Sequence, residues 1–130
     1  MTKSAALLVL LALAGCATSP RRPSVTALNS LLSQAAAQVR PCYRFPRVSH
    51  SGRQIVTRIR VRMTPEGYPE GLPMVYAQYG VTPENEEFAD RMAEAAIGAV
   101  MRCAPLRLPP DLYEAGWRDF YLIFSPRASA

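Results

Sequence analysis

The stretch Ile55-Val-Thr-Arg-Ile-Arg-Val-Arg-Met63, followed by Thr64-Pro-Glu-Gly67, decides the fold. Apolar residues and one threonine occupy the odd-numbered positions of the first segment, and three arginines occupy even-numbered positions. This period of two predicts a strand with one buried and one solvated face. In the turn, proline presets the first corner and glycine supplies a positive φ. A shorter strand from Leu72 or Pro73 to about Gln78 completes an antiparallel hairpin.

Apolar residues at helical spacing predict one helix on each side of this hairpin. The first helix begins after Ser24, which can cap it, and ends at Pro41. The second opens at Thr82-Pro-Glu84, with threonine as the cap and proline at the first helical position. It ends before Pro105.

The last element is a strand from Trp117 to Phe124, in which Phe120, Leu122 and Phe124 alternate inward. The element order is therefore helix, strand, strand, helix, strand. We expect an α+β fold, a small two-layer domain over residues 25–126 in which a three-stranded antiparallel sheet packs on helices. Residues 127–130 are expected to form a frayed tail.

The N-terminal segment predicts export. Lys3 precedes an uncharged apolar run over residues 5–14, which small residues follow. This is the order of a secretory signal peptide, here residues 1–15. The run is too short to span a hydrocarbon core of about 30 Å.

Cys16 directly follows the predicted signal peptide. Leu13-Ala-Gly-Cys16 resembles the lipobox of bacterial lipoproteins, which implies lipidation of Cys16 and anchoring to a membrane. Residues 16–24 would then be the lipid anchor and a short tether. The alternative is an ordinary signal peptide cleaved near Ala14 or Ala17.

Charge and cysteine content narrow the remaining possibilities. The formal net charge is +5, but the arginines are scattered and no nucleic-acid motif occurs, so we expect no nucleic-acid partner. If Cys16 carries lipid, Cys42 and Cys103 form an even pair in an oxidising compartment, which favours a disulfide between them. Without a CxxC motif, and with one histidine, a metal site is not expected. The alternative to this disulfide is that Cys42 and Cys103 are two buried free thiols.

Few residues suggest catalysis. His50 lies in a polar turn and is expected to be solvated. Glu84, Glu86 and Glu87 favour stabilisation of a helix N-terminus over a cation site. No Gly-rich phosphate loop, HExxH or GxSxG occurs. We therefore expect no enzyme, no cofactor and no small-molecule substrate.

Three segments in order carry a family resemblance: Met63-Thr-Pro-Glu-Gly67 with Gly71-Leu-Pro73, then Cys103-Ala-Pro-Leu-Arg-Leu-Pro109, then Tyr113, Trp117 and Phe124-Ser-Pro126. From about Leu31 to Pro126 the chain resembles the C-terminal domain shared by TolA and TonB, most closely the TolA type of alphaproteobacteria. Cys42 lies where such domains carry a partner cysteine.

The resemblance implies a periplasmic module that binds a protein or peptide by strand addition, with Tol–Pal components or outer-membrane receptors as partners. A typical TolA or TonB has an N-terminal transmembrane helix that engages a proton-driven motor, and here a lipoprotein signal is expected instead. We therefore expect binding without motor coupling. Ala17 after the acylated cysteine favours the outer membrane by analogy with enteric sorting. The rival interpretation is a pilotin-like structural or assembly lipoprotein of an outer-membrane complex.

In TolA- and TonB-like domains the partner pairs with the last strand. Here that strand contains no proline or glycine to guard its edge. We expect Trp117, Asp119, Tyr121 and Ile123 to form an outward row that binds the partner. The alternative is that residues 106–116 fold back over this row.

Overall fold

The computed structural model describes Gly15 and residues 22–126. The predicted lipidation site Cys16, nearly all of the predicted signal peptide, most of the predicted tether and the tail 127–130 lie outside the described residues. Within the described ranges, no helix combines the length and apolar character needed to cross a membrane.

The first helix, α1 (Val25–Val39), begins and ends where the sequence predicts. Ser24 caps it, because the Ala27 N–H donates to Ser24 Oγ at 3.1 Å. A 3₁₀ turn, Arg40–Cys42, then carries Pro41 and ends the helix.

The predicted hairpin consists of β1 (Val56–Arg62) and β2 (Met74–Tyr79). The odd-numbered residues of β1 are buried, which confirms the predicted alternation. Gly67 in the connecting loop has φ +90°, as the turn chemistry requires, and its carbonyl accepts a hydrogen bond from the Leu106 N–H at 2.8 Å. A side chain at Gly67 would collide with the Leu106 backbone, so this glycine also permits a close approach of two chain segments.

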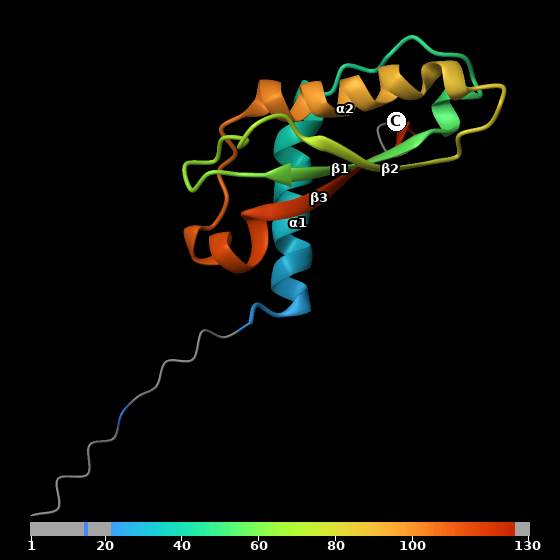
Figure 1. Cartoon of the computed structure of the whole chain (residues 1–130). Helices are drawn as coiled ribbons and strands as arrows, with labels where there is room; N and C mark the ends of the chain where they lie inside the picture. Colours follow the sequence, from blue (N-terminus) through green and yellow to red (C-terminus); the bar gives the residue numbers. More distant parts are fainter. Residues whose placement is uncertain (1–14, 16–21, 127–130) are drawn as a thin grey trace, which may run out of the picture.

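The last strand, β3 (Asp119–Phe124), pairs with β1 to give an antiparallel sheet in the order β2-β1-β3. In Figure 1, α1 passes behind the sheet across the strand direction, and α2 (Ala89–Cys103) lies above it. Both helices contribute to one core with the inner face of the sheet, and the other face is left open. The predicted α+β fold is confirmed.

The core is formed by buried apolar residues from both helices, the sheet and the segment between α2 and β3. They are Leu31, Ala35, Val39, Ile59, Val61, Met63, Ala96, Ala99, Val100, Leu106, Leu108, Trp117, Phe120 and Leu122. Because this core faces one side of the sheet only, the side chains on the other side remain available for contacts.

The second helix begins later than predicted. It was expected to open at Thr82, but α2 starts at Ala89 after a 3₁₀ turn over Glu86–Phe88. The reason is Asn85, which is buried and whose amide accepts from the Thr82 N–H and donates to the carbonyls of Ser51 and Gly80. These long-range bonds hold the preceding residues as a loop.

Cys42 and Cys103 form the predicted disulfide, with 5.7 Å between their Cα atoms. The bridge joins the residue that ends the turn after α1 to the last residue of α2. Arg102 supports the same junction, because its guanidinium donates to the Cys42 carbonyl at 2.9 and 3.2 Å. The two helices are therefore held together at this end of the core.

Candidate functional site

The outer edge of β3, one of the two edges of the sheet, is the candidate for partner binding that the sequence predicts. The strand order places β1 on one side of β3, and no strand within residues 22–126 pairs with its other side. A strand with one unpaired edge offers a row of N–H and C=O groups to an incoming chain.

The pairing register shows which groups point outward. The Met63 N–H donates to the Arg118 carbonyl at 2.9 Å, so Met63 and Arg118 form a hydrogen-bonded pair. Bonded and non-bonded pairs alternate in an antiparallel ladder. The N–H and C=O groups of Asp119, Tyr121 and Ile123 therefore point away from β1, toward the free edge. Three of the four residues predicted as the binding row have this orientation.

A groove runs along this edge between β3 and α1. It has a volume of about 330 Å³ and is lined mainly by apolar side chains. The lining residues are Leu28, Leu31 and Leu32 of α1, Arg58 of β1, Ala115 and Gly116, and Phe120, Tyr121 and Ile123 of β3. A second, separate pocket of about 80 Å³ lies between residues 36–43 and residues 122–125, and Ile123 lines both. The groove therefore lies beside Phe120, Tyr121 and Ile123 of β3 and has an apolar wall on the helix side.

Arg58 and two tyrosines form a cluster on the open face of the sheet. The guanidinium carbon of Arg58 lies 4.5 Å from the ring centre of Tyr121 and 5.0 Å from that of Tyr76. The two rings are 4.8 Å apart and meet edge to face. These contacts hold a cation against aromatic rings beside the free edge.

Arg60 is paired differently. Its guanidinium makes a two-pronged contact with the Asp119 carboxylate, with Nε to Oδ1 at 2.9 Å. This hydrogen bond and the positive charge of Arg60 lower the pKa of Asp119, and Arg62 adds to the effect. The same pairing raises the pKa of Arg60. Asp119 is therefore a paired carboxylate at the start of β3.

The prediction for Trp117 is wrong. Trp117 is 2% exposed, lies in the core, and precedes β3 in a π-helical turn over Tyr113–Trp117. Its indole N–H donates to the Pro109 carbonyl at 2.7 Å, and the Tyr113 ring packs on it at 4.6 Å. The turn rotates the chain before the strand begins, so strand alternation cannot be extended back to residue 117.

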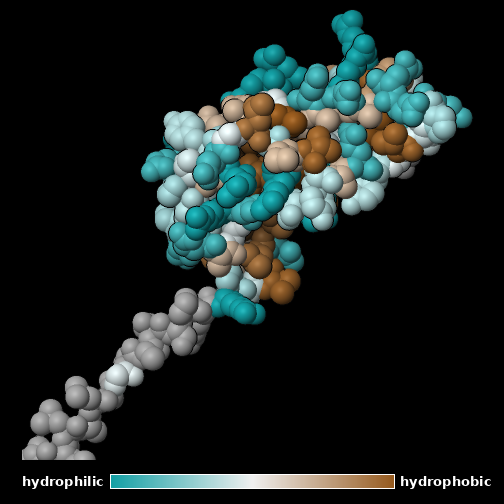
Figure 2. Space-filling model, viewed as in Figure 1, coloured by the Kyte–Doolittle hydropathy of each residue, from teal (hydrophilic) through white to brown (hydrophobic). Residues whose placement is uncertain are grey.

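The other members of the predicted row remain accessible. Ile123 is 65% exposed, Asp119 is exposed and Tyr121 is partly exposed. Segment 106–116 therefore covers only Trp117 among the four. Figure 2 shows the open face, where hydrophilic side chains cross the centre and hydrophobic side chains lie below them over α1.

Two parts of this site were not predicted. Tyr76 joins the cluster because the register with β1 shifts between Arg58 and Ile59, an irregularity that strand periodicity does not reveal. Leu28 and Leu32 were assigned to the first helix, but their place opposite β3 depends on how α1 crosses the sheet.

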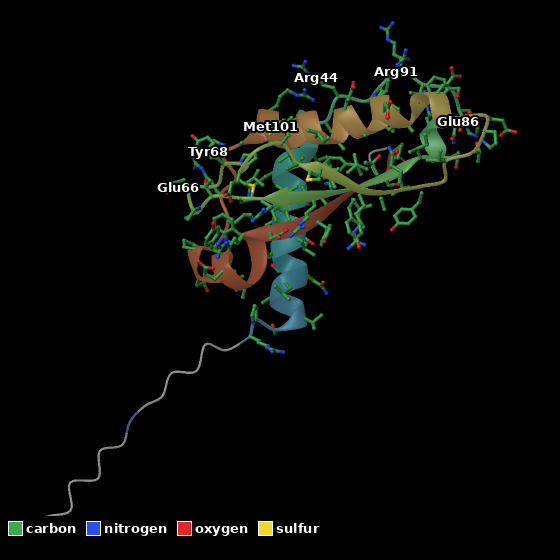
Figure 3. The ribbon with its side chains drawn as sticks, viewed as in Figure 1. Arg44, Glu66, Tyr68, Glu86, Arg91 and Met101 are labelled. Carbon is green, nitrogen blue, oxygen red and sulfur yellow. A yellow bond between two sulfur atoms is a disulfide. The ribbon has the colours of Figure 1, made fainter. Side chains whose placement is uncertain are left out.

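The side chains considered as candidates for catalysis or cation binding lie on the surface. His50 is exposed in a turn, as are Glu84, Glu86 and Glu87 in the segment before α2. Figure 3 places Glu86 at one end of the molecule and Glu66 at the other. Among residues 15 and 22–126, no group of three or more histidine, cysteine or acidic residues is arranged to hold a metal.

Comparisons with family models, with curated proteins and with solved structures found no match to this chain.

Proposed function

We propose that this chain is a membrane-anchored envelope lipoprotein whose domain binds an extended segment of another protein. The incoming segment adds to the sheet as a fourth strand at the free edge of β3. The observation that carries the proposal is the coincidence of outward N–H and C=O groups on β3 with an apolar groove beside them.

The geometry of the edge supports strand addition over binding of a folded surface. An added strand would lie about 4.8 Å from β3, in the space beside α1. Its side chains would alternate between the groove wall, formed by Leu28 and Leu32, and the open face near Ile123. Backbone hydrogen bonds would then supply affinity, and both sets of side chains would supply selectivity.

The resemblance to TolA- and TonB-type domains supports the same edge and suggests Tol–Pal components or outer-membrane receptors as partners. The lipobox-like Leu13-Ala-Gly-Cys16 supports an anchor at a membrane facing the periplasm, and the outer membrane is the favoured one. Three acyl chains on Cys16 would exceed the two signals needed for stable anchoring.

Selection of binding peptides tests the edge directly. The full chain, purified in detergent, is used to select from a phage-displayed library of random peptides, and a synthetic copy of the most enriched peptide is added to the protein. Hydrogen exchange should slow at the amides of Asp119, Tyr121 and Ile123. Slower exchange on β2 alone, or a selection that yields no binder, would contradict strand addition at β3.

Proline variants add a matched control. Ile123→Pro removes one outward N–H without breaking the ladder to β1, so it should abolish peptide binding while the protein stays folded. Ile123→Ala keeps that N–H and should retain much of the affinity. Val75 pairs with Ile59 in β1, and its N–H points away from β1 at the opposite edge of the sheet. Val75→Pro should therefore leave binding unchanged.

The anchor requires a separate test. Cys16→Ala should prevent lipoprotein processing and release the chain from membranes in cell fractionation. A Cys16→Ala chain that is processed normally and still sediments with membranes would overturn the lipidation proposal without affecting the binding edge.

A further inference from the structure

We infer that Arg58 reads a carboxylate on the incoming strand, so that the partner is an extended acidic peptide with apolar residues on both sides of an aspartate or glutamate. This inference rests on the proposed strand addition and adds the chemistry of its partner.

Arg58 belongs to β1, one strand away from the free edge, yet it lines the groove beside β3. Its guanidinium carbon lies between the Tyr121 ring of β3, at 4.5 Å, and the Tyr76 ring of β2, at 5.0 Å. Arg58 is paired in register with Ile123, whose backbone faces the incoming strand. A residue added beside Ile123 on the open face would be about 10 Å from the Arg58 backbone, two strand spacings away, so its carboxylate and the Arg58 guanidinium would have to meet over β3.

The charge of Arg58 is not matched by a carboxylate in the described part of the chain. The ion pairs there join Arg60 to Asp119 and Arg118 to Glu114. Arg58 has aromatic neighbours instead, and its Nε is buried without a hydrogen-bond partner among the described residues. The rings hold the guanidinium plane and displace water, which strengthens a charge-assisted, two-pronged bond to a carboxylate.

The apolar wall sets the neighbouring positions of the peptide. Successive side chains of a strand point to opposite faces, so the residues before and after the acid would face α1. Leu28, Leu31 and Leu32 line that wall. The preferred segment is therefore apolar–acidic–apolar, and the positive net charge of the chain favours its approach.

The test compares two versions of the peptide selected on the full chain, one with its acidic residue and one with the neutral isostere Gln or Asn. Fluorescence anisotropy on the full chain in detergent should give about tenfold or greater preference for the acidic version. In Arg58→Gln this preference should fall below about threefold, whereas Arg62→Gln, on the same face of β1, should retain it. Arg58→Lys keeps the charge but loses the planar group, and should give an intermediate preference.

The outcomes separate this inference from the function on which it rests. Peptides that slow exchange at the Ile123 amide but bind equally well without their acid would overturn the role of Arg58 and leave strand addition standing. A preference that survives Arg58→Gln and disappears in Arg62→Gln would overturn it as well. Circular dichroism and thermal unfolding show whether Arg58→Gln is folded. If it is not, Tyr121→Glu is used instead. It places a carboxylate of the chain itself beside Arg58 and should weaken binding of the acidic peptide more than binding of the neutral one.

Discussion

Trp117 gives the sharpest test of the structure, because strand periodicity places it on the binding face and the fold places it in the core. Replacement by alanine should cost about 3–5 kcal/mol in unfolding free energy. Trp117→Phe keeps an aromatic ring but loses the hydrogen bond to the Pro109 carbonyl, which is then left unpaired. Because the phenylalanine ring is also smaller, we expect Trp117→Phe to lower the unfolding free energy by about 2–3 kcal/mol.

This loss corresponds to a fall in Tm of about 10–20 °C, since 1 kcal/mol shifts Tm by about 4–8 °C in a domain of this size. Thermal unfolding of Trp117→Phe, followed by circular dichroism, measures this change in Tm. Trp117 is the only tryptophan, so its fluorescence in the wild-type chain also reports its burial. Iodide should quench the native protein much less than the urea-unfolded protein.

Two results would refute this reasoning. The first is equal quenching of the native and unfolded chains, which would mean that Trp117 is exposed. The second is a Trp117→Phe variant with unchanged Tm that no longer binds the selected peptide. That combination would return Trp117 to the partner-binding row.

Three further predictions concern stability. Replacing both cysteines of the disulfide by alanine should lower the unfolding free energy by about 2–4 kcal/mol, since closing a loop of 61 residues contributes about 4 kcal/mol in the chain-entropy model. Urea unfolding measures this loss. A loss below about 1 kcal/mol, or two alkylatable thiols in the unreduced protein, would contradict the disulfide. Gly67→Ala should cost at least about 1–3 kcal/mol, and more than Gly71→Ala, because both glycines have positive φ but only Gly67 faces backbone at close range. The ion pair with Arg60 lowers the pKa of Asp119 in the folded protein. The ion pair therefore stabilises the fold at pH values above about 4, the ordinary pKa of an aspartate, and this stabilisation is lost as the pH falls through the lower pKa of folded Asp119. The stability of Asp119→Asn should therefore depend less on pH in acid, and high salt should shrink the difference from wild type because the pair is exposed.

Much of the fold could be predicted because its signals are local. The alternation from Ile55 to Met63 needs only the period of a strand, and the cap at Ser24 needs only its own first turn. The late start of α2 could not be predicted, because Asn85 is held by a carbonyl from Ser51, far away in the sequence. Trp117 was misplaced for a related reason, since a π-helical turn breaks the period just before β3.

The sequence by itself determined the element order, the inward face of β1 and a last strand without proline or glycine. These follow from residue type and spacing, which act over a few neighbours. Only the tertiary structure decided that α1 forms a groove wall beside β3, that Arg58 lies between Tyr76 and Tyr121, and that Trp117 is buried. Such features depend on strand register and on the angle at which a helix crosses the sheet. Both are set by packing among residues distant in the chain, which no local pattern records.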